Sequence, residues 1–321
     1  MGEDLCHHAD RIQAAIASDA AAKSALVASW RRSSSLHRLN PTDCSPPRYL
    51  TEAELGEARQ RIEPLVRAAQ SSLDRLYLAV GGVGCCVLLA DRNGVPVERR
   101  GAPVDDETFH SWGLWTGSVW NEECQGTNGI GTCLVEQRTL TIHRDQHFQT
   151  RNTGLSCTTA PIYDHEGNLV AALDVSSCRA DLTEAFASLI SVAVVDAVRR
   201  IEAENFRMAF PKARILLAPV TDKGSGALIA VDVDDLVVGA TRSARLALGI
   251  TQQCLDKPMP AADLLGWAES GPEVLAGAER GVLQRALARA DGNVSAAAQA
   301  LGISRATLHR KLNRLDAHRS H

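Results

Sequence analysis

This chain of 321 residues lacks several features that define large classes of proteins. It has no uninterrupted apolar run of roughly 18 residues, the length that a membrane-spanning helix needs, so no membrane partner is expected. Its first residues lack the basic stretch and apolar stretch of a secretory signal. Lysine and aromatic residues are also scarce. The lack of a membrane-spanning run and of a secretory signal favours a cytoplasmic protein.

No two of the nine cysteines stand in a Cys-x-x-Cys pair. An odd count in a chain of this size, without an export signal, favours reduced thiols over a disulfide framework. Buried cysteine behaves as a small hydrophobic residue, and that is the expected role of most of them. No metal site and no cofactor are expected.

Positive charge is concentrated at one end of the chain. Residues 279–321 hold eight Lys and Arg against three Asp and Glu, a net charge of +5. The remaining residues hold 26 against 35, a net charge of −9. A basic segment attached to an acidic chain indicates a nucleic-acid partner for that segment.

Residues 1–70 are expected to form a helical N-terminal segment. Proline interrupts the helical pattern at 40–41 and again at 46–47. Apolar residues then recur at mostly helical spacing over 52–78. Pro64 lies inside this stretch and predicts a kink or a division there.

The apolar period then changes from helical to strand-like. The run 85–89 leads into the turn 91–94 and continues at 95–97, which predicts a hairpin. A second unit of the same kind spans 158–175. The two units predict an antiparallel sheet flanked by helices, and so an α+β domain over residues 71–180.

Residues 181–210 contain no glycine or proline and predict one long helix. Its apolar residues, Leu189 among them, form a stripe that fits two structures: a helix packed on its own sheet, or a signalling helix at a dimer interface. Within residues 213–270, the segment 226–250 then predicts a strand, a turn, a strand and a helix. This order resembles the opening of a PAS domain, and the segment is short enough to be an abbreviated unit.

Residues 275–317 predict an all-α unit of three helices. Gly292 ends the first helix, and Asn293 can cap the second. Gly302 stands where a left-handed helix end is needed, which glycine adopts without steric cost. Ser304 can then cap the third helix.

The third helix carries cations outside its apolar stripe of Leu308, Leu312 and Leu315. Arginine can neutralise phosphate or bind guanine, and a threonine methyl can meet thymine. The side chains nearest the helix start are expected to reach the bases. The predicted DNA-binding residues are Ser304, Arg305, Thr307, His309, Arg310, Lys311 and Arg314.

This segment resembles the Fis-type helix-turn-helix at the end of bacterial enhancer-binding activators. The resemblance covers residues 281–315 and implies that those side chains face DNA. Such modules bind as dimers to inverted half-sites about one helical turn apart. A double-stranded DNA operator and a homodimer are therefore expected.

Residues 29–176 resemble the GAF domain, and the segment before it, of acetoin- and glycerol-type transcriptional activators. The resemblance implies a small-molecule effector such as an alcohol, a diol or an acyloin. The motifs that carry it are Ser29-Trp30-Arg31-Arg32-Ser33, Trp120-Asn121-Glu122-Glu123, Gly126-Thr127-Asn128-Gly129-Ile130-Gly131-Thr132, Leu155-Ser156-Cys157 and Ala172-Leu173-Asp174-Val175.

Four aromatic residues occur within twelve positions of this region, a density that can line an apolar pocket or simply fill the core. The candidate pocket residues are Phe109, Trp112, Trp115, Trp120, Cys86 and Cys157. The glycine-rich stretch 126–131 lacks the lysine of a phosphate loop, so we interpret it as a tight turn in which Asn128 bonds its own main chain.

Two alternatives use the cysteines or histidines instead. A redox or metal sensor is one, since His143 and His147 stand four apart and would share a face if helical. A GAF-type thiol enzyme that reduces methionine sulfoxide with paired cysteines is the other; Cys86, Cys124 and Cys157 are its candidates. We expect no catalytic residues.

The sequence contains no Gly-Lys dipeptide, and hence no Walker A loop, although the resembled activators carry an ATPase between sensor and DNA module. The Gly-Ala-Phe-Thr-Gly-Ala motif that contacts sigma-54 is absent too. We therefore predict a regulator that acts without ATP hydrolysis, by occupying DNA, contacting RNA polymerase or modulating a fuller relative.

Overall fold

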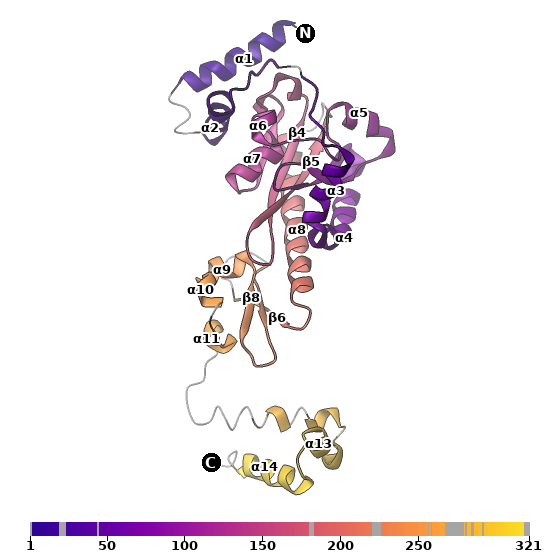
Figure 1. The fold of residues 1–321 in the computed structure, drawn as a ribbon, viewed down its shortest axis with the longest axis vertical. Helices are drawn as coiled ribbons and strands as arrows, with labels where there is room; N and C mark the ends of the chain where they lie inside the picture. The colour runs from indigo at the N-terminus through magenta and orange to yellow at the C-terminus, as the bar shows by residue number, and fades with distance from the viewer. Residues whose placement is uncertain are drawn as a thin grey trace. The chain divides into compact units, whose positions relative to one another are not determined.

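The computed structural model describes residues 2–18, 24–43, 45–179, 183–219, 226–255, 257, 259–266, 279, 281–283, 286–290 and 292–317. The chain divides into two compact units, Met1–Ala261 and Ala262–His321. Each unit is described by itself (Figure 1).

A five-stranded antiparallel sheet organises the first unit. Its order is β2-β1-β5-β4-β3, and both predicted hairpins are present. Asp91 Oδ1 closes the first turn by accepting from the N–H groups of Asn93 and Val95, at 2.9 and 3.0 Å. The β1–β5 pairing joins the hairpins into one sheet. The strands are β1 (Cys85–Asp91), β2 (Pro96–Arg100), β3 (Leu140–His143), β4 (Ser156–Tyr163) and β5 (Leu169–Ser177).

Two long helices, α4 (Glu63–Val80) and α8 (Glu184–Ala209), cover one face of this sheet (Figure 1). The shorter α3 (Glu52–Arg61) precedes α4, and the predicted division at Pro64 is confirmed, because this proline lies in the first turn of α4. The hydroxyl of Thr183 caps α8 by accepting from the N–H of Phe186. The predicted single long helix is therefore confirmed.

One side of α8 packs on the sheet, with Val194 and Ile201 fully buried in the shared core. Another side faces solvent, where Leu189 is 66% exposed and Val192 is 71% exposed. The reading of α8 as a helix packed on its own sheet is thus confirmed for one side. Leu189 lies outside that packed side.

The opposite face of the sheet is covered by three short helices and the loop 112–120. These helices are α5 (Asp106–Ser111), α6 (Glu122–Gln125) and α7 (Gly129–Glu136). The side chain of Asn128 accepts from the N–H of Gly131 and donates to the carbonyl of Gly126, both at 2.8 Å. The predicted bonding of Asn128 to its own main chain is confirmed, and this bonding caps α7.

The N-terminal segment is helical as predicted and packs on the sheet domain through Trp30 and Ile12, which contact Phe148. Its helices are α1 (Gly2–Ala17), α2 (Ala25–Arg31) and the π-helical turn η2 (Arg32–Leu36). Short 3₁₀ turns complete the first unit at η3 (Gly81–Val83), η4 (Pro103–Asp105), η5 (Arg144–Gln146) and η6 (Thr150–Asn152).

A second antiparallel sheet follows α8, with the order β6-β7-β8. The two predicted strands and the helix α9 (Arg242–Leu248) are confirmed, while β6 was not predicted. Phe206 of α8 packs on this sheet, so α8 is anchored in both sheets. The other elements here are β6 (Arg214–Leu217), β7 (Leu228–Val231), β8 (Val237–Ala240), α10 (Gln252–Leu255) and α11 (Ala261–Leu265).

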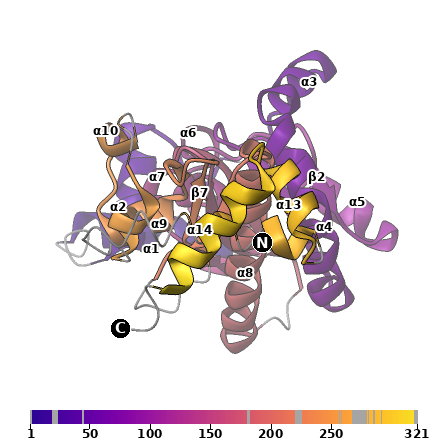
Figure 2. The ribbon, with the colours of Figure 1, turned by 90° about the horizontal axis from the view of Figure 1, so that it is seen from below.

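The C-terminal unit contains α13 (Val294–Ala300) and α14 (Arg305–Ala317), preceded by helical residues at 279, 281–283 and 286–289 (Figure 2). Leu308 is fully buried against Leu283 and Ala297, as the predicted stripe requires. The side chain of Leu315 lies outside the described residues. Across the described ranges, none of the helices has both the length and the apolarity needed to span a membrane.

A buried polar network holds the N-terminal segment to the sheet domain. The carboxylate of Glu122, which is 2% exposed, accepts from Nε and Nη2 of Arg32 at 3.0 Å each. The hydroxyl of Ser29 donates to the same carboxylate at 2.7 Å and lies 2.7 Å from the hydroxyl of Thr127. We call these four residues the Arg32–Glu122 network. Two sequence motifs about 90 residues apart thus meet in one ion pair.

Burial alone raises the pKa of Glu122, but the hydrogen bonds from Arg32, Ser29 and Thr132 outweigh it, and the pKa lies below its usual value. A carboxyl group with a lowered pKa stabilises the folded state above its unfolded pKa. This stability is lost as the pH falls through the folded pKa.

Substituting Arg32→Met leaves the buried Glu122 without its cation, so we expect the free energy of unfolding at pH 7 to fall by about 3–5 kcal/mol. Urea denaturation followed by tryptophan fluorescence measures this change. The exposed neighbour Arg31→Met is the matched control and should change it little. The gap between wild type and Arg32→Met should narrow at acidic pH; equal losses in both variants would show that the ion pair is not the cause.

Candidate effector site and DNA-binding helix

The structure brings five of the six candidate pocket residues into one cluster on the sheet. Cys86, Cys157, Phe109 and Trp120 are at most 3% exposed, and Trp112 packs against them half-buried. Phe109 and Trp120 therefore belong to the core. Trp115 lies apart from the cluster, half-buried, with its ring 4.1 Å from the guanidinium carbon of Arg99.

Trp112 also lines a surface pocket of about 370 Å³, where the outer part of the aromatic cluster meets solvent. The amide nitrogen of Asn152 in its wall is buried and has no hydrogen-bond partner among the described residues. Sequence reasoning missed the other lining residues, because they come from distant segments and no local pattern links them. They are Pro46, Pro47, Ser111, Gln125, Arg151 and Asn152.

A chain of buried polar groups crosses the same face of the sheet. Asp174 accepts from the hydroxyls of Thr159 and Ser176, at 2.5 and 2.6 Å. The Ser176 oxygen lies 3.1 Å from Cys157 Sγ, and that sulfur lies 3.5 Å from Nε2 of His147. Nδ1 of His147 lies 2.9 Å from the carbonyl of Arg144 and donates to it, so the imidazole is held as a neutral acceptor toward the thiol.

Burial sets the protonation of this chain. It raises the pKa of Asp174 to about 6 and lowers the pKa of His147 to about 4. It also raises the pKa of Cys86 and of Cys157 well above the ordinary thiol value. The thiolate is the reactive form of cysteine, so these two thiols are protonated and unreactive at neutral pH.

Cys86 and Cys157 are also too far apart to form a disulfide. Both pair with Ser176, from the two sides of β5, so their strands are two spacings apart. Two spacings are roughly 10 Å, whereas bridged cysteines need Cα atoms within about 7 Å. The geometry therefore gives no support to a redox switch or a paired-cysteine enzyme built on this pair.

His143 and His147 do not lie on one helix, which was the condition for them to share a face. His143 ends β3, where its Nδ1 lies 2.9 Å from the hydroxyl of Ser156, and His147 follows the 3₁₀ turn η5. The short turn between them replaces the helix that would have aligned the rings. Within the described part of the chain, no three His, Cys, Asp or Glu side chains gather as a metal site would require.

The third helix of the C-terminal unit presents its start to solvent. The hydroxyl of Ser304 accepts from the N–H of Thr307 at 3.1 Å, which confirms Ser304 as the cap of α14. Arg305, His309 and Arg310 are exposed, as DNA contacts require. Gly302 has a φ of +65°, the left-handed conformation predicted for it.

One predicted DNA-binding residue, Lys311, differs from this pattern. Lys311 is half-buried and its ammonium group forms an ion pair with Glu279 of the preceding helical stretch. Lys311 thus contributes to packing within the unit, and that pairing competes with a phosphate contact. The side chain of Arg314 lies outside the described residues.

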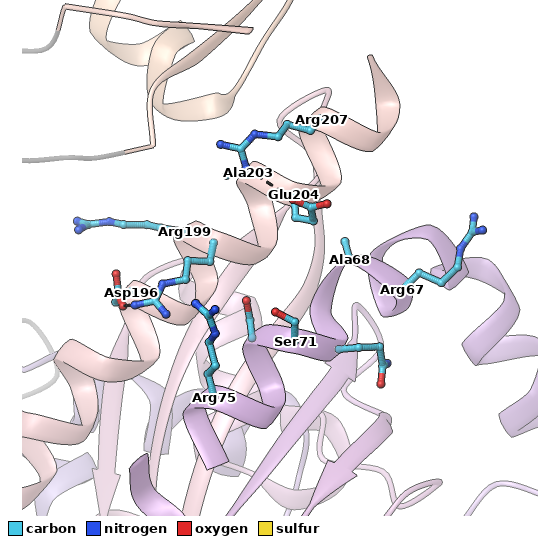
Figure 3. Close-up of a pocket in the computed structure, with 12 residues that line it drawn as sticks. Arg67, Ala68, Ser71, Arg75, Asp196, Arg199, Ala203, Glu204 and Arg207 are labelled. Atoms are coloured by element: carbon cyan, nitrogen blue, oxygen red, sulfur yellow. Dashed lines mark hydrogen bonds and ion pairs between the residues drawn. The ribbon is translucent and has the colours of Figure 1, made fainter. Parts of the chain in front are cut away.

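A polar groove of about 680 Å³ lies between α4 and α8 (Figure 3). Figure 3 shows Arg75 of α4 near Asp196 of α8, and Ala68 near Glu204, so the two helices run in opposite directions. Arginines dominate the groove, which differs from the mostly apolar pockets that hold small ligands. They are Arg67, Arg75, Arg199, Arg200 and Arg207.

Comparison with known families confirms both resemblances. Residues 64–199 match the GAF domain, and residues 275–315 match the bacterial regulatory protein Fis family. The solved E. coli DhaR(N)–DhaL complex shares the fold, with a TM-score of 0.52 and 13% identity over 74% of this chain and 80% of that one. The predicted fold class, an α+β GAF domain plus a Fis-type helix-turn-helix, is therefore confirmed.

Several similar proteins are named as transcriptional regulators. The acetoin catabolism regulatory protein of Cupriavidus necator is 34% identical over 73% of this chain and 36% of its own length. MimR, the propane 2-monooxygenase operon activator of Mycolicibacterium smegmatis, is 30% identical over 52% of this chain and 27% of its own. AcoR, the Bacillus subtilis acetoin dehydrogenase operon activator, is 26% identical over 46% and 25%.

The chain is thus a protein with a GAF domain and a Fis-type DNA-binding domain. By this combination the chain is similar to proteins named as transcriptional regulators of acetoin catabolism. It spans about a third of the length of the curated relatives it matches. The segment between its two matched regions is residues 200–274.

The raised pKa of Asp174 makes a stability prediction with a definite sign. Folding favours the protonated form, so wild-type stability falls as the pH rises from about 4 to about 6, and the loss persists above that. Asp174→Asn removes the charge. We expect it to raise the free energy of unfolding at pH 8 by about 2 kcal/mol and to change it little at pH 4.

Denaturation curves at the two pH values test this prediction. The half-buried turn residue Asp164→Asn serves as the control, because it changes the same functional group outside the core. If Asp174→Asn lowered the free energy of unfolding equally at both pH values, the prediction that the pKa of Asp174 is raised in the folded protein would be wrong.

Proposed function

We propose that this chain is a cytoplasmic, sequence-specific DNA-binding transcriptional regulator. Its GAF domain senses a small metabolite, and its Fis-type unit binds an operator without ATPase activity. The exposed start of α14 carries the proposal: Ser304, Arg305 and Arg310 face solvent on a helix with no acidic residue from 304 to 315. Similarity to named regulators supports the same function. We expect no catalytic activity and no cofactor.

The position of each side chain on α14 suggests its role. Arg305 lies in the first turn and Thr307 follows within the same turn, which is where recognition helices reach base edges. His309 and Arg310 lie one turn later and suit phosphate contacts. Occupation of the operator, or contact with RNA polymerase, then changes transcription.

Signal transfer is proposed to run through α8. This helix packs on the GAF sheet at one end and on the sheet β6-β7-β8 at the other. An effector that binds one packing of the GAF dimer more tightly shifts the population toward it. The spacing of the two recognition helices changes with that packing.

The homodimer is proposed to use the exposed side of the α4–α8 pair. Leu78 of α4 and Leu189 and Val192 of α8 are 83%, 66% and 71% exposed. The helices are antiparallel, so these apolar side chains lie toward the same end of the pair, beyond the arginine-lined groove. A cluster of exposed apolar residues beside a polar surface is typical of an association site.

Val192→Glu should therefore weaken the dimer, because it buries a charge in the proposed interface. Sedimentation equilibrium should show a rise of at least tenfold in the dimer dissociation constant. Val233→Glu is the control, since Val233 is 89% exposed in a turn of the other sheet. A wild-type monomer, or a dimer unchanged by Val192→Glu, would contradict the proposed surface.

DNA binding predicts different effects for two arginines of α14. Arg305→Ala should cost about 1–3 kcal/mol on the operator and relax its sequence preference. Arg310→Ala should weaken binding to all sequences and reduce the slope of log K against log salt by about one. Exposed Arg289, in the first helical stretch of the same unit, is the matched control and should change neither.

Gel-shift titrations at several salt concentrations measure both effects, using operator fragments found by mapping bound sites across the genome. Equal losses of operator affinity for Arg289→Ala and Arg305→Ala would show that binding depends only on general charge attraction. That result would contradict recognition by α14.

A further inference from the structure

Arg99 of β2 projects onto the same face of the sheet as the aromatic cluster. Its pairing partner in the neighbouring strand β1 is Leu88, a fully buried member of that cluster. Its guanidinium carbon lies 4.1 Å from the ring of Trp115 and 5.6 Å from the ring of Phe109. Its side chain is only 11% exposed. Two aromatic contacts therefore fix the plane of a nearly buried cation.

The hydrogen-bond partners of this guanidinium are incomplete. Nη1 lies 2.8 Å from Oδ1 of Asp106 on α5, which is an ion pair without hydrogen-bond geometry, since this oxygen is also buried without a hydrogen-bond partner among the described residues. Nε and Nη2 are buried and have no hydrogen-bond partner anywhere in the described ranges. Buried donors of a charged group are costly to leave unpaired, so such an arrangement in a folded protein calls for an explanation.

The two unpaired nitrogens form one recognition edge. In a guanidinium group, Nε–H and the adjacent Nη2–H point in the same direction, and this pair matches the two oxygens of a carboxylate. Asp106 lies on the opposite side of the guanidinium group, next to Nη1. The geometry of Arg99 thus leaves a single bidentate edge available.

The neighbouring arginine shows that this arrangement is specific to one face. Arg100 projects to the opposite side of β2, where Nε donates to Asp74 and Nη2 donates to Gln70, both at 2.7 Å. Its Nη1 donates to Glu98 at 3.1 Å. In β2, therefore, Arg100 has hydrogen-bond partners for all three of its nitrogens, whereas Nε and Nη2 of the adjacent Arg99 have none among the described residues.

Gly101 packs directly against the guanidinium group of Arg99. A Cβ atom built on Gly101 would overlap Nη2 and Cζ of Arg99 and lie 3.1 Å from Nη1, although the backbone there is not left-handed and would accept alanine. Glycine at position 101 is therefore explained by the close approach of the Arg99 guanidinium group and not by the backbone conformation. Trp115 is half-buried, and the side chain of Asp106 is 40% exposed. The residues that surround the guanidinium group of Arg99 therefore reach the surface.

We propose that the Nε–Nη2 edge of Arg99 binds the carboxylate of the effector, and that the effector is therefore a small organic acid. This inference rests on the proposed function of the GAF domain as a metabolite sensor. It departs from the neutral alcohols, diols and acyloins that the family resemblance implies. Trp115 and Phe109 orient the cation, and Asp106 limits it to one carboxylate.

The test uses the full chain and thermal unfolding, with acetate, lactate, pyruvate, succinate and benzoate as probes. Lactamide, which has the shape of lactate without its charge, and potassium chloride are the controls. We expect at least one carboxylate to raise the Tm in a saturable way at millimolar concentration, while lactamide and chloride do not. If none of the five acids raises the Tm, or lactamide acts as lactate does, the proposal is wrong.

Variants then locate the site for the acid that binds. Arg99→Lys keeps the charge but loses the bidentate edge, and Gly101→Ala places a methyl group against it; each should raise the Kd at least tenfold by calorimetry. Arg100→Lys on the opposite face and Gly82→Ala, which has open space around its Cβ position, are the matched controls and should leave the Kd unchanged.

Arg99→Met separates a ligand site from a structural role. Removing the two unpaired donors breaks no hydrogen bond. Because Arg99→Met also removes the ion pair with Asp106 and the contacts with Trp115 and Phe109, we expect a small drop in the Tm of the ligand-free protein and complete loss of the response to the acid. A large drop in the ligand-free Tm, with the response retained, would make Arg99 structural. Loss of the response in Asn152→Ala but not in Arg99→Lys would place the acid in the pocket beside Trp112 and overturn the proposal.

This outcome is independent of the DNA experiments. Failure of every carboxylate, with operator binding that still depends on Arg305, would overturn the inference about Arg99 and leave the proposed regulator intact. Loss of specific DNA binding altogether would instead refute the proposed function, whatever binds at Arg99.

Discussion

The pairing of Arg32 with Glu122 is the contact on which the arrangement of the sensor depends. The carboxylate is almost fully buried, and burial of an unpaired carboxylate would be costly. The cation comes from the π-helical turn after α2, so the N-terminal helices must pack in one position to supply it. That position places Trp30 against Phe148 and fixes the start of α6. The matched GAF segment begins at residue 64, yet part of its core is completed by residues before it.

Much of the fold could be predicted from local sequence. The Asp91 turn, the proline at the start of α4 and the Thr183 cap each act within a few residues, and the elements they predict are present. The short strands β3 and β6 were missed, because four residues give too little periodicity. The β1–β5 pairing was missed as well, since it joins distant segments and no turn signals it.

The sites divide in the same way. Ser304 could be predicted as the cap of α14, because capping is a local interaction. The ion pair of Lys311 with Glu279 could not, since it depends on how two helices pack. The aromatic residues were found by their density, but their separation into core, pocket wall and a ring stacked on Arg99 follows from the tertiary fold. Arg99 itself gave no sequence signal, because an arginine in a strand is ordinary until its partners are known.

Helix α8 has 26 residues, which at 1.5 Å each give a rod of roughly 39 Å. Each residue of an α-helix also turns the chain by about 100°. The number of residues in α8 therefore sets the angle between the two sheets that it joins. An insertion of a single residue would rotate everything beyond it by more than a quarter turn, whereas many substitutions on its exposed side would leave that angle unchanged. Length is thus a stricter evolutionary constraint on this helix than composition.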